Sequence, residues 1–275
     1  MSQVHMYEKF YSLQQKPFAI TSNPSFLYLS QRHKEALSHL TYGIRERVGF
    51  IEITGEIGTG KTTLCRALLN QLDERTKTAF IFNSNMSELQ LMQTIIEDLG
   101  IKTEKRGKGA LFSELNRFLI DQLTQHNNVV LIIDEAQNLS NKMLEQIRML
   151  SNLEAGNHKL LQIVLVGQPE LRDKLKSPSL RQLRQRIAVR CHIEALSFED
   201  VPLYILHRLK LAGANGSGPV FDDEALQEIY KYSGGVPRLI NILCDKALLT
   251  GYVMENRSID GNVIRQCVHE IEGGS

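Results

Sequence analysis

The stretch that decides the fold of this chain is Gly55-Glu56-Ile57-Gly58-Thr59-Gly60-Lys61-Thr62, which Thr63 follows. It fits the pattern G-x-x-x-x-G-K-[ST] of a phosphate-binding loop, or P-loop. The run before it, 49–54, predicts a buried strand, and the residues after it, 61–72, predict a helix. In such a loop the backbone N–H groups turn towards phosphates, and the helix N-terminus adds its positive dipole end. We therefore predict that residues 55–63 bind a nucleoside triphosphate.

Two side chains of the loop have predicted roles of their own. Lys61 is expected to reach the β- and γ-phosphates, and the hydroxyl of Thr62 is expected to bind Mg²⁺. The loop alone does not distinguish a kinase, a GTPase and a mechanical ATPase. The choice among these classes therefore depends on residues elsewhere in the chain.

Composition sets the broad class. The 275 residues are 42% hydrophobic and 23% charged, as in ordinary globular proteins, and the formal net charge of +1 gives no general argument for binding nucleic acid or anionic membrane. The four cysteines form no C-x-x-C pair, which argues against zinc and for a reducing cytosol. No secretory signal or stretch of about 18 apolar residues is visible, so we expect a cytoplasmic protein, peripheral at the inner membrane only through a partner.

Apolar runs alternate between strand and helix length across the middle of the chain. The predicted strands are 49–54, 78–83, 129–134, 160–167 and 187–193, and the predicted helices are 31–46, 61–72, 88–99, 110–125, 140–153 and 169–176. This alternation predicts an α/β fold with a parallel five-stranded sheet sandwiched by helices.

After Leu196 the strand pattern stops. Helices are predicted near 198–212, 222–233, 236–253 and 260–271, which together make a C-terminal helical lid. We therefore expect an entry segment over 1–48, a core over 49–196 and a lid domain over 197–272.

The second strong motif is the strand that ends in Asp134-Glu135. Next to a P-loop, such a strand is a Walker B strand, and Asp134 is expected to hold Mg²⁺. Glu135 lies where a carboxylate can deprotonate the attacking water as a general base. Because a kinase must avoid water, the acidic pair favours hydrolysis.

Polar residues end two further strands. Gln168 is predicted to lie between Glu135 and the γ-phosphate, although Gln168-Pro169-Glu170 could instead only start a helix. Asn83, with Asn85 as the nearby alternative, could hydrogen-bond the carboxylate of Glu135 and keep it from activating water. The alternative is that the asparagine only stabilises the turn after the strand.

Arginines form the last set of candidates. Arg186 is our first choice, and Arg184 the second, for an arginine finger that completes the ATP site of a neighbouring subunit. The alternative is a solvated basic helix end or a nucleic-acid contact. Arg238, at the start of a lid helix, is predicted to reach the γ-phosphate, or else to be an ordinary surface arginine.

Taken together, these motifs resemble the AAA+ ATPases. The match extends to the ExeA/GspA-type secretion ATPases, through the entry segment from Tyr7 to Leu37, the runs 54–63, 133–139 and 166–171, and the lid run 234–241. The resemblance covers nearly the whole chain. Its length resembles the short ATPases associated with exosortase (PEP-CTERM) and exopolysaccharide loci, although a fragment of a longer protein also fits.

The resemblance implies an ATP- and Mg²⁺-dependent ATPase that assembles into a ring or another head-to-tail homo-oligomer. It would power or regulate the assembly of a membrane-associated export system through a membrane-protein partner. ATP is expected to bind between core and lid, with Phe18, Tyr28 and Leu29 near adenine. The alternatives are a DNA-binding switch ATPase of the transposition-regulator type and a P-loop kinase.

Overall fold

The computed structural model describes residues 7–20, 24–82, 86–156, 158–214 and 218–273. Contacts divide the chain into two compact units. The sheet unit comprises residues 31–57 and 64–193, and the helical unit comprises residues 1–30, 58–63 and 194–275. The expected entry segment is thus divided after Ser30, and its first part groups with the lid helices.

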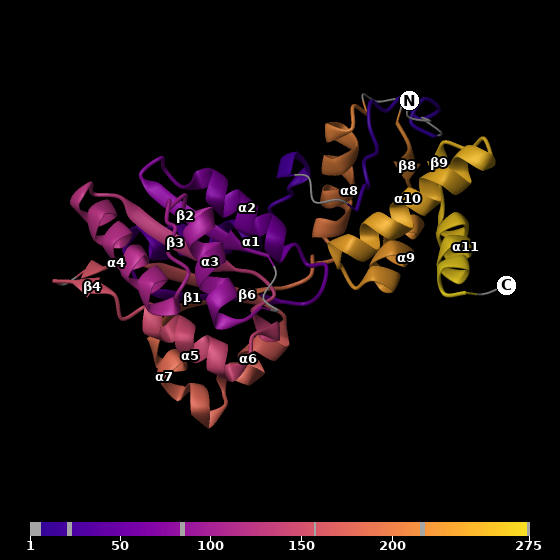
Figure 1. Ribbon diagram of the computed structural model, residues 1–275. Helices are drawn as coiled ribbons and strands as arrows, with labels where there is room; N and C mark the ends of the chain where they lie inside the picture. The colour runs from indigo at the N-terminus through magenta and orange to yellow at the C-terminus, as the bar shows by residue number, and fades with distance from the viewer. Residues whose placement is uncertain (1–6, 21–23, 83–85, 157, 215–217, 274–275) are drawn as a thin grey trace. The chain divides into compact units, whose positions relative to one another are not determined.

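The sheet unit is built on five parallel strands (Figure 1). In spatial order they are β2 (Thr76–Ile81), β3 (Asn128–Ile133), β6 (Gln162–Gly167), β1 (Phe50–Gly55) and β7 (Ile187–Ile193). β1, β3 and β6 are almost entirely buried, as the continuous apolar runs of their sequences require. The predicted five-stranded parallel sheet is therefore confirmed.

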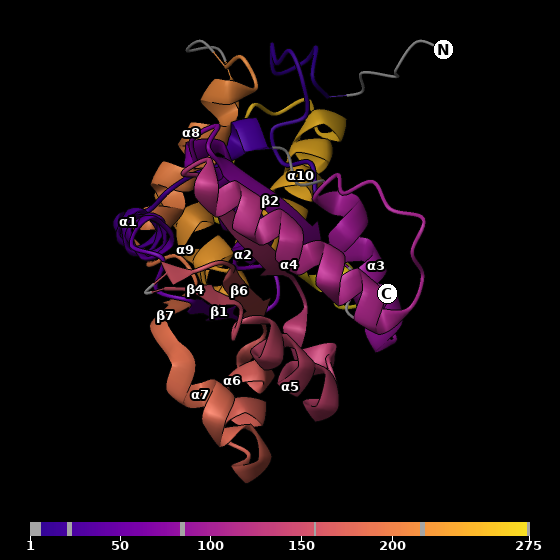
Figure 2. The same ribbon diagram turned by 60° about the vertical axis from the view of Figure 1, so that its left-hand side comes forward.

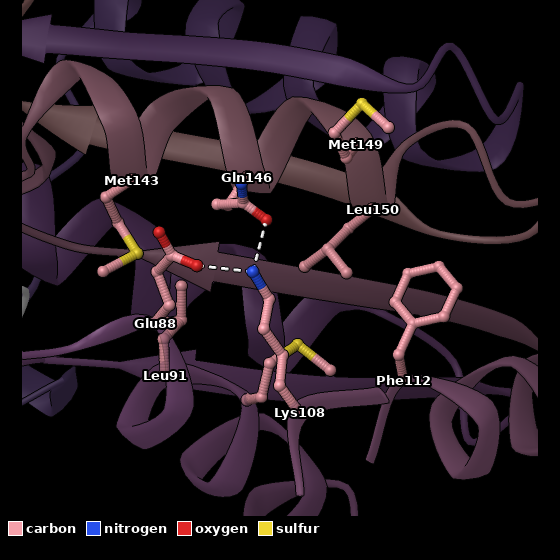
Figure 3. Close-up of a pocket in the computed structure, with 9 residues that line it drawn as sticks. Glu88, Leu91, Lys108, Phe112, Met143, Gln146, Met149 and Leu150 are labelled. Carbon is pink, nitrogen blue, oxygen red and sulfur yellow. Dashed lines mark hydrogen bonds and ion pairs between the residues drawn. The ribbon is translucent and has the colours of Figure 1, made fainter. Parts of the chain in front are cut away.

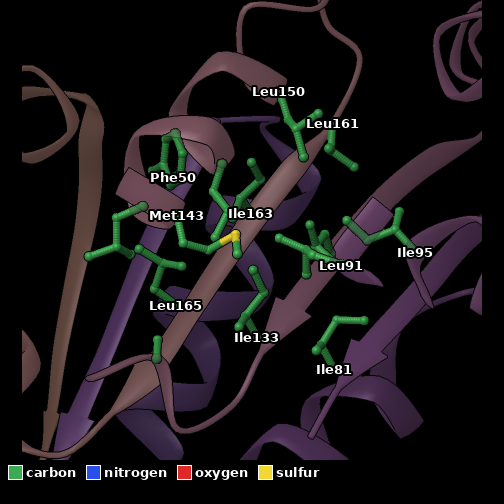
Figure 4. Close-up of a cluster of buried hydrophobic side chains, with 14 of the residues drawn as sticks. Phe50, Ile81, Leu91, Ile95, Ile133, Met143, Leu150, Leu161, Ile163 and Leu165 are labelled. Carbon is green, nitrogen blue, oxygen red and sulfur yellow. The ribbon is translucent and has the colours of Figure 1, made fainter. Parts of the chain in front are cut away.

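The helices of this unit cover the sheet from both sides. The main hydrophobic cluster joins one sheet face, with Ile81, Ile133 and Ile163, to side chains of the helices over it (Figure 4). Those helices are α3 (Glu88–Asp98), α4 (Lys108–Thr124), α5 (Asn141–Leu150), α6 (Pro169–Leu175) and the short α7 (Arg181–Arg186). Figure 2 shows α4 crossing in front of β2 with α3 beside it.

Helix α1 (Gln31–Arg45) covers the opposite sheet face. Gly43 approaches this face so closely that a Cβ atom there would lie 3.2 Å from Ile51 and from Val189. Helix α2 (Lys61–Gln71) follows the P-loop directly.

Side chains of helices α3, α4 and α5 line a small hollow that is partly open to solvent (Figure 3). Its floor is apolar, and Lys108 closes one end by donating to Gln146 Oε1 at 2.9 Å and pairing with Glu88. Lys142 also contacts Glu88, at 3.2 Å, and the two cations hold the pKa of Glu88 below its usual range. This polar bridge ties the starts of the three helices together.

The helical unit contains α8 (Asp200–Leu211), α9 (Asp223–Ser233), α10 (Pro237–Val253) and α11 (Gly261–Ile271). Its core also takes aromatic side chains from the N-terminal segment, among them Tyr11 and Phe26. Arg208, only 7% exposed, donates to the carbonyl oxygen of Ala19 at 3.2 Å and lies 4.9 Å from the centre of the Phe26 ring. The N-terminal segment is therefore part of this core.

Side-chain caps stabilise the starts of three helices. Ser87 and Gln90 form a capping box at the start of α3, with Gln90 N 3.3 Å from Ser87 Oγ and Ser87 N 2.8 Å from Gln90 Oε1. Asp222 and Asp260 cap α9 and α11 by accepting from backbone N–H groups at 2.7 and 2.9 Å. Among the described residues, no helix is long and apolar enough to span a bilayer.

The sequence did not predict the shortest elements. These are η1 (Pro24–Phe26), η2 (Ala136–Asn138), η3 (Pro178–Leu180), α7, the pair β4 (Glu154–Ala155) with β5 (His158–Lys159), and the pair β8 (Val220–Phe221) with β9 (Ser258–Ile259). Elements of two to six residues are too short to show an apolar period.

Two adjacent glycines make a matched pair for a stability test. Gly235 has φ +78°, and a Cβ atom there would overlap the carbonyl oxygen of Leu196, whereas Gly234 has φ +55° and open space around it. We expect Gly234→Ala to cost about 1–2 kcal/mol for the left-handed backbone alone, and Gly235→Ala to cost about 3–5 kcal/mol because the backbone must also move. Urea unfolding of both variants checks this, and equal losses would contradict it.

Candidate functional site

The P-loop has the predicted local structure. β1 ends at Gly55, α2 begins at Lys61, and the loop between them turns through Gly58 and Gly60, whose φ angles are +82° and +98°. The side chains of Thr59 and Lys61 are buried, Thr62 and Thr63 are half-buried, and Glu56 and Ile57 are exposed. The loop therefore opens a helix of eleven residues, whose N-terminus suits an anion.

Arg238 lies against this loop within the helical unit. Its backbone N–H donates to the carbonyl oxygen of Gly58 at 3.3 Å, and a Cβ atom on Gly58 would lie 2.7 Å from Arg238 Cβ. The side chain of Arg238 is exposed. The structure thus brings the predicted lid arginine to the phosphate-binding loop.

Asp134 and Glu135 follow β3 as predicted. Asp134 is 3% exposed and accepts the backbone N–H of Glu135 at Oδ1, 2.9 Å away. Glu135 adopts a left-handed backbone, φ 52° and ψ 37°, and leads into the 3₁₀ turn η2. A non-glycine residue in this region is uncommon and occurs mostly where the surroundings impose it, as at active sites.

Gln168 is brought to Glu135. β6 lies beside β3 in the sheet, and Gln168 Nε2 lies 3.3 Å from Glu135 Oε2. Gln168 is also the N-cap residue of α6, as the alternative interpretation expected, and its place between Glu135 and the γ-phosphate stays a prediction. Asn83 and its alternative Asn85 lie outside the described residues.

Gln137 was not predicted to have a role, yet its amide contacts both Glu135 and Gln168. Gln137 Nε2 donates to Glu135 Oε2 at 2.6 Å, and Gln137 Oε1 accepts the backbone N–H of Gln168 at 3.1 Å. The only signal in the sequence was an amide two residues after the acidic pair, which by itself indicates nothing about its partners.

Two polar residues of β1, Glu52 and Thr54, were also not predicted to have a role. Glu52, 2% exposed, lies 3.3 Å from Arg190 Nε and 4.0 Å from Arg172 Nε. Burial raises the pKa of Glu52, and the two arginines oppose that rise. Thr54 Oγ1 accepts from Arg172 Nη2 at 3.3 Å and lies 3.0 Å from His192 Nδ1. The strand that enters the P-loop is therefore braced by polar groups from α6 and β7.

The two candidate finger arginines differ in their surroundings. Arg186 Nη1 donates to Ser151 Oγ at 2.9 Å and contacts Asn152 Oδ1. Arg184 is exposed, its guanidinium has no hydrogen bond or ion pair in the described part of the chain, and its carbonyl oxygen accepts from Arg190 Nη2 at 2.7 Å. The guanidinium of Arg186 is thus engaged by contacts within its own chain.

The three candidate adenine contacts belong to the helical unit. Phe18 is fully buried and meets Phe221 edge to face, with ring centres 6.3 Å apart. Tyr28 donates to Asp200 Oδ1 at 3.2 Å, and Leu29 is half-buried. Phe18 therefore packs in the core of this unit, and contact with adenine stays a prediction.

The predicted Mg²⁺ ligands have suitable chemistry. Thr62 offers a hydroxyl and Asp134 a carboxylate, and Mg²⁺ prefers oxygen donors and is bound by one or two carboxylates together with phosphates. Within the described residues, no group of three or more His, Cys, Asp and Glu residues could hold a metal ion.

The contact between Gly58 and Arg238 can be tested without nucleotide. Both Gly58→Ala and Gly60→Ala place an alanine at positive φ, but only the former meets other atoms, at Arg238 and Val236. We expect Gly58→Ala to lower the free energy of unfolding by about 1–3 kcal/mol more than Gly60→Ala, because its Cβ atom overpacks the loop. Chemical denaturation measures the difference, and indistinguishable variants would show that Arg238 does not pack on the loop.

Comparisons with known proteins show what this chain is similar to. Residues 44–175 match the family model described as AAA domain. The chain is 43% identical over 269 residues to General secretion pathway protein A of Aeromonas hydrophila. The aligned region covers 98% of this chain and 49% of that protein. It therefore spans about half the length of this relative.

Solved structures share the fold at low identity. The origin recognition complex of Drosophila bound to DNA aligns with a TM-score of 0.71 and 17% identity, over 99% of this chain and 70% of that chain. Cdc6p from Pyrobaculum aerophilum aligns with a TM-score of 0.70 and 18% identity, over 90% of this chain and 70% of that chain. This chain therefore has the P-loop AAA+ fold, matches the AAA domain model over residues 44–175, and is similar along nearly its whole length to a General secretion pathway protein A.

Proposed function

We propose that this chain is an ATP-hydrolysing AAA+ module that uses Mg²⁺. The observation that carries the proposal is the carboxylate of Glu135, which two amides contact at the end of β3. Parallel strands end at one edge of their sheet, and β6 separates β3 from β1, the strand that leads into the P-loop. The edge that presents the phosphate-binding loop thus also presents a general base for water.

The roles follow from the chemistry of each residue. The loop residues 55–63 bind the phosphates, with Lys61 on the β- and γ-phosphates, and Thr62 and Asp134 hold Mg²⁺. Glu135 takes the proton of the attacking water, and Gln168 orients that water. Arg238 reports from the lid helix whether the γ-phosphate is present.

Substitutions separate binding from hydrolysis. Lys61→Ala removes a charge-assisted contact, so we expect ATP to bind about 10- to 100-fold more weakly. Glu135→Gln keeps the shape and removes the base, so we expect ATP affinity within about 3-fold of the parent chain and turnover about 10²- to 10⁴-fold slower. Fluorescent-nucleotide titration and phosphate release measure the two quantities. Unchanged turnover in Glu135→Gln would show that Glu135 is not the general base.

The process that ATP hydrolysis drives is inferred from the relative. Because that relative is named a general secretion pathway protein, we propose that this module powers or regulates assembly of a membrane-associated export system. It would act through a membrane-protein partner, in the manner of the short exosortase-associated ATPases. A neighbouring exosortase gene would support this assignment, and a neighbouring transposase gene would favour the DNA-binding alternative.

We further propose a head-to-tail homo-oligomer in which one subunit donates an arginine to the site of the next. Between the two candidates, the contacts favour Arg184, because the guanidinium of Arg186 is engaged by Ser151 and Asn152 of its own subunit. Arg184 extends from the exposed side of α7 and could reach a neighbour without breaking such contacts.

Subunit mixing tests this assignment. Arg184→Ala and Glu135→Gln chains should each be inactive alone, while their mixture should recover phosphate release, because one subunit supplies the base and its neighbour the arginine. Arg186→Ala is the matched control and should mainly lower thermal stability. If phosphate release recovers in mixtures of Glu135→Gln with Arg186→Ala chains, and not in mixtures with Arg184→Ala chains, Arg186 is the arginine finger.

A further inference from the structure

We infer that Gln137 is a positioning residue for hydrolysis: its amide fixes the Glu135 carboxylate and the start of α6 relative to each other. The inference rests on the proposed function, because it names a residue that acts through the proposed base. It does not require Gln137 to touch ATP or water.

Both ends of the Gln137 amide are engaged. The nitrogen donates to Glu135 Oε2 at 2.6 Å, and the oxygen accepts from the backbone N–H of Gln168 at 3.1 Å. Gln168 Nε2 reaches the same carboxylate oxygen at 3.3 Å. Three residues from two neighbouring strand ends therefore form a closed set of contacts. Two donors on one oxygen restrict the rotation of the Glu135 carboxylate.

The turn that carries Gln137 is itself held in place. Glu135 has a left-handed backbone, and Gln137 follows within η2, whose Ala136 is fully buried. From α6, Lys174 Nζ donates to the carbonyl oxygen of Leu139 at 2.8 Å and contacts that of Gln137. The left-handed residue costs free energy, and these contacts oppose its relaxation.

Gly167 provides the space for the amide. A Cβ atom at this last residue of β6 would lie 2.7 Å from Gln137 Oε1 and 2.9 Å from Leu171 Cδ2. The φ angle of Gly167 is not positive, so the backbone conformation does not demand glycine there. Close approach of the Gln137 and Leu171 side chains explains why glycine precedes Gln168.

Such positioning matters because a general base must lie within hydrogen-bond reach of the proton that it removes. A displacement of about 1 Å can slow a reaction roughly 100-fold while substrate binding is unchanged. The contacts of Gln137 lie on the base and on the residue beside it, so their loss should affect turnover and leave ATP affinity intact.

The first experiment compares Gln137→Ala with Asn138→Ala in the full chain. Asn138 is the next residue of the same turn, and its exposed side chain has no hydrogen bond among the described residues. We expect Gln137→Ala to lower kcat about 10- to 100-fold with KM for ATP changed less than about 3-fold. Asn138→Ala should match the parent chain in both constants.

A second experiment displaces the amide without removing it. Gly167→Ala should push Gln137 away from Glu135 and lower kcat in the same way. If it acts through Gln137, it should lower kcat far less in a Gln137→Ala background, where the clashing oxygen is absent. This non-additivity in a double-mutant cycle separates loss of positioning from general destabilisation, which would add in the two variants.

The outcomes distinguish the inference from the function on which it rests. A parent chain that binds ATP but releases no phosphate would contradict the proposed function. If the parent chain hydrolyses ATP but the Gln137→Ala variant keeps the parent kcat, only the role of Gln137 is overturned. The same holds if Gln137→Ala raises KM and lowers both kcat and the melting temperature. Additive effects of Gly167→Ala and Gln137→Ala would overturn it as well.

Discussion

The parallel direction of the five strands is the constraint on which the candidate site depends. Each strand enters the sheet from the same side, so the residues that follow the strands emerge together at the opposite edge. At that edge β1 leads into the P-loop, β3 into Asp134 and Glu135, and β6 into Gln168. Residues separated by about a hundred positions in the sequence become neighbours because backbone hydrogen bonds align the strands that carry them.

This dependence places strict demands on the central strands. β1 and β6 are buried along their whole lengths and offer only apolar faces, apart from Glu52, Thr54 and Gln162. Gln162 Oε1 accepts the backbone N–H of Gly49 at 2.8 Å, and Glu52 and Thr54 meet arginines and a histidine. Because a buried polar group without a partner costs free energy, these pairings favour the observed register between β1 and its neighbours.

The parts that could be predicted from the sequence share a local cause. Strand and helix positions follow apolar periods, and the caps at Ser87, Asp222 and Asp260 depend on residues three positions apart. Polar residues at the ends of predicted parallel strands were likewise enough to predict that Gln168 lies near Glu135, whereas the order of the strands in the sheet comes from the structure. What the sequence did not reveal depends on side chains that meet across the fold, such as Arg208 with the N-terminal segment.

Gln137 shows why such contacts escape prediction. Its role requires the left-handed backbone of Glu135, which turns the chain so that a residue two positions later faces back towards the carboxylate. It also requires the missing side chain of Gly167 on another strand. Neither condition is visible in the residues around position 137. The proposed function of a glutamine two residues after Glu135 therefore depends on residues that are close to it only in the folded chain. The polar contacts around Glu135 follow from the fold and not from a sequence motif alone.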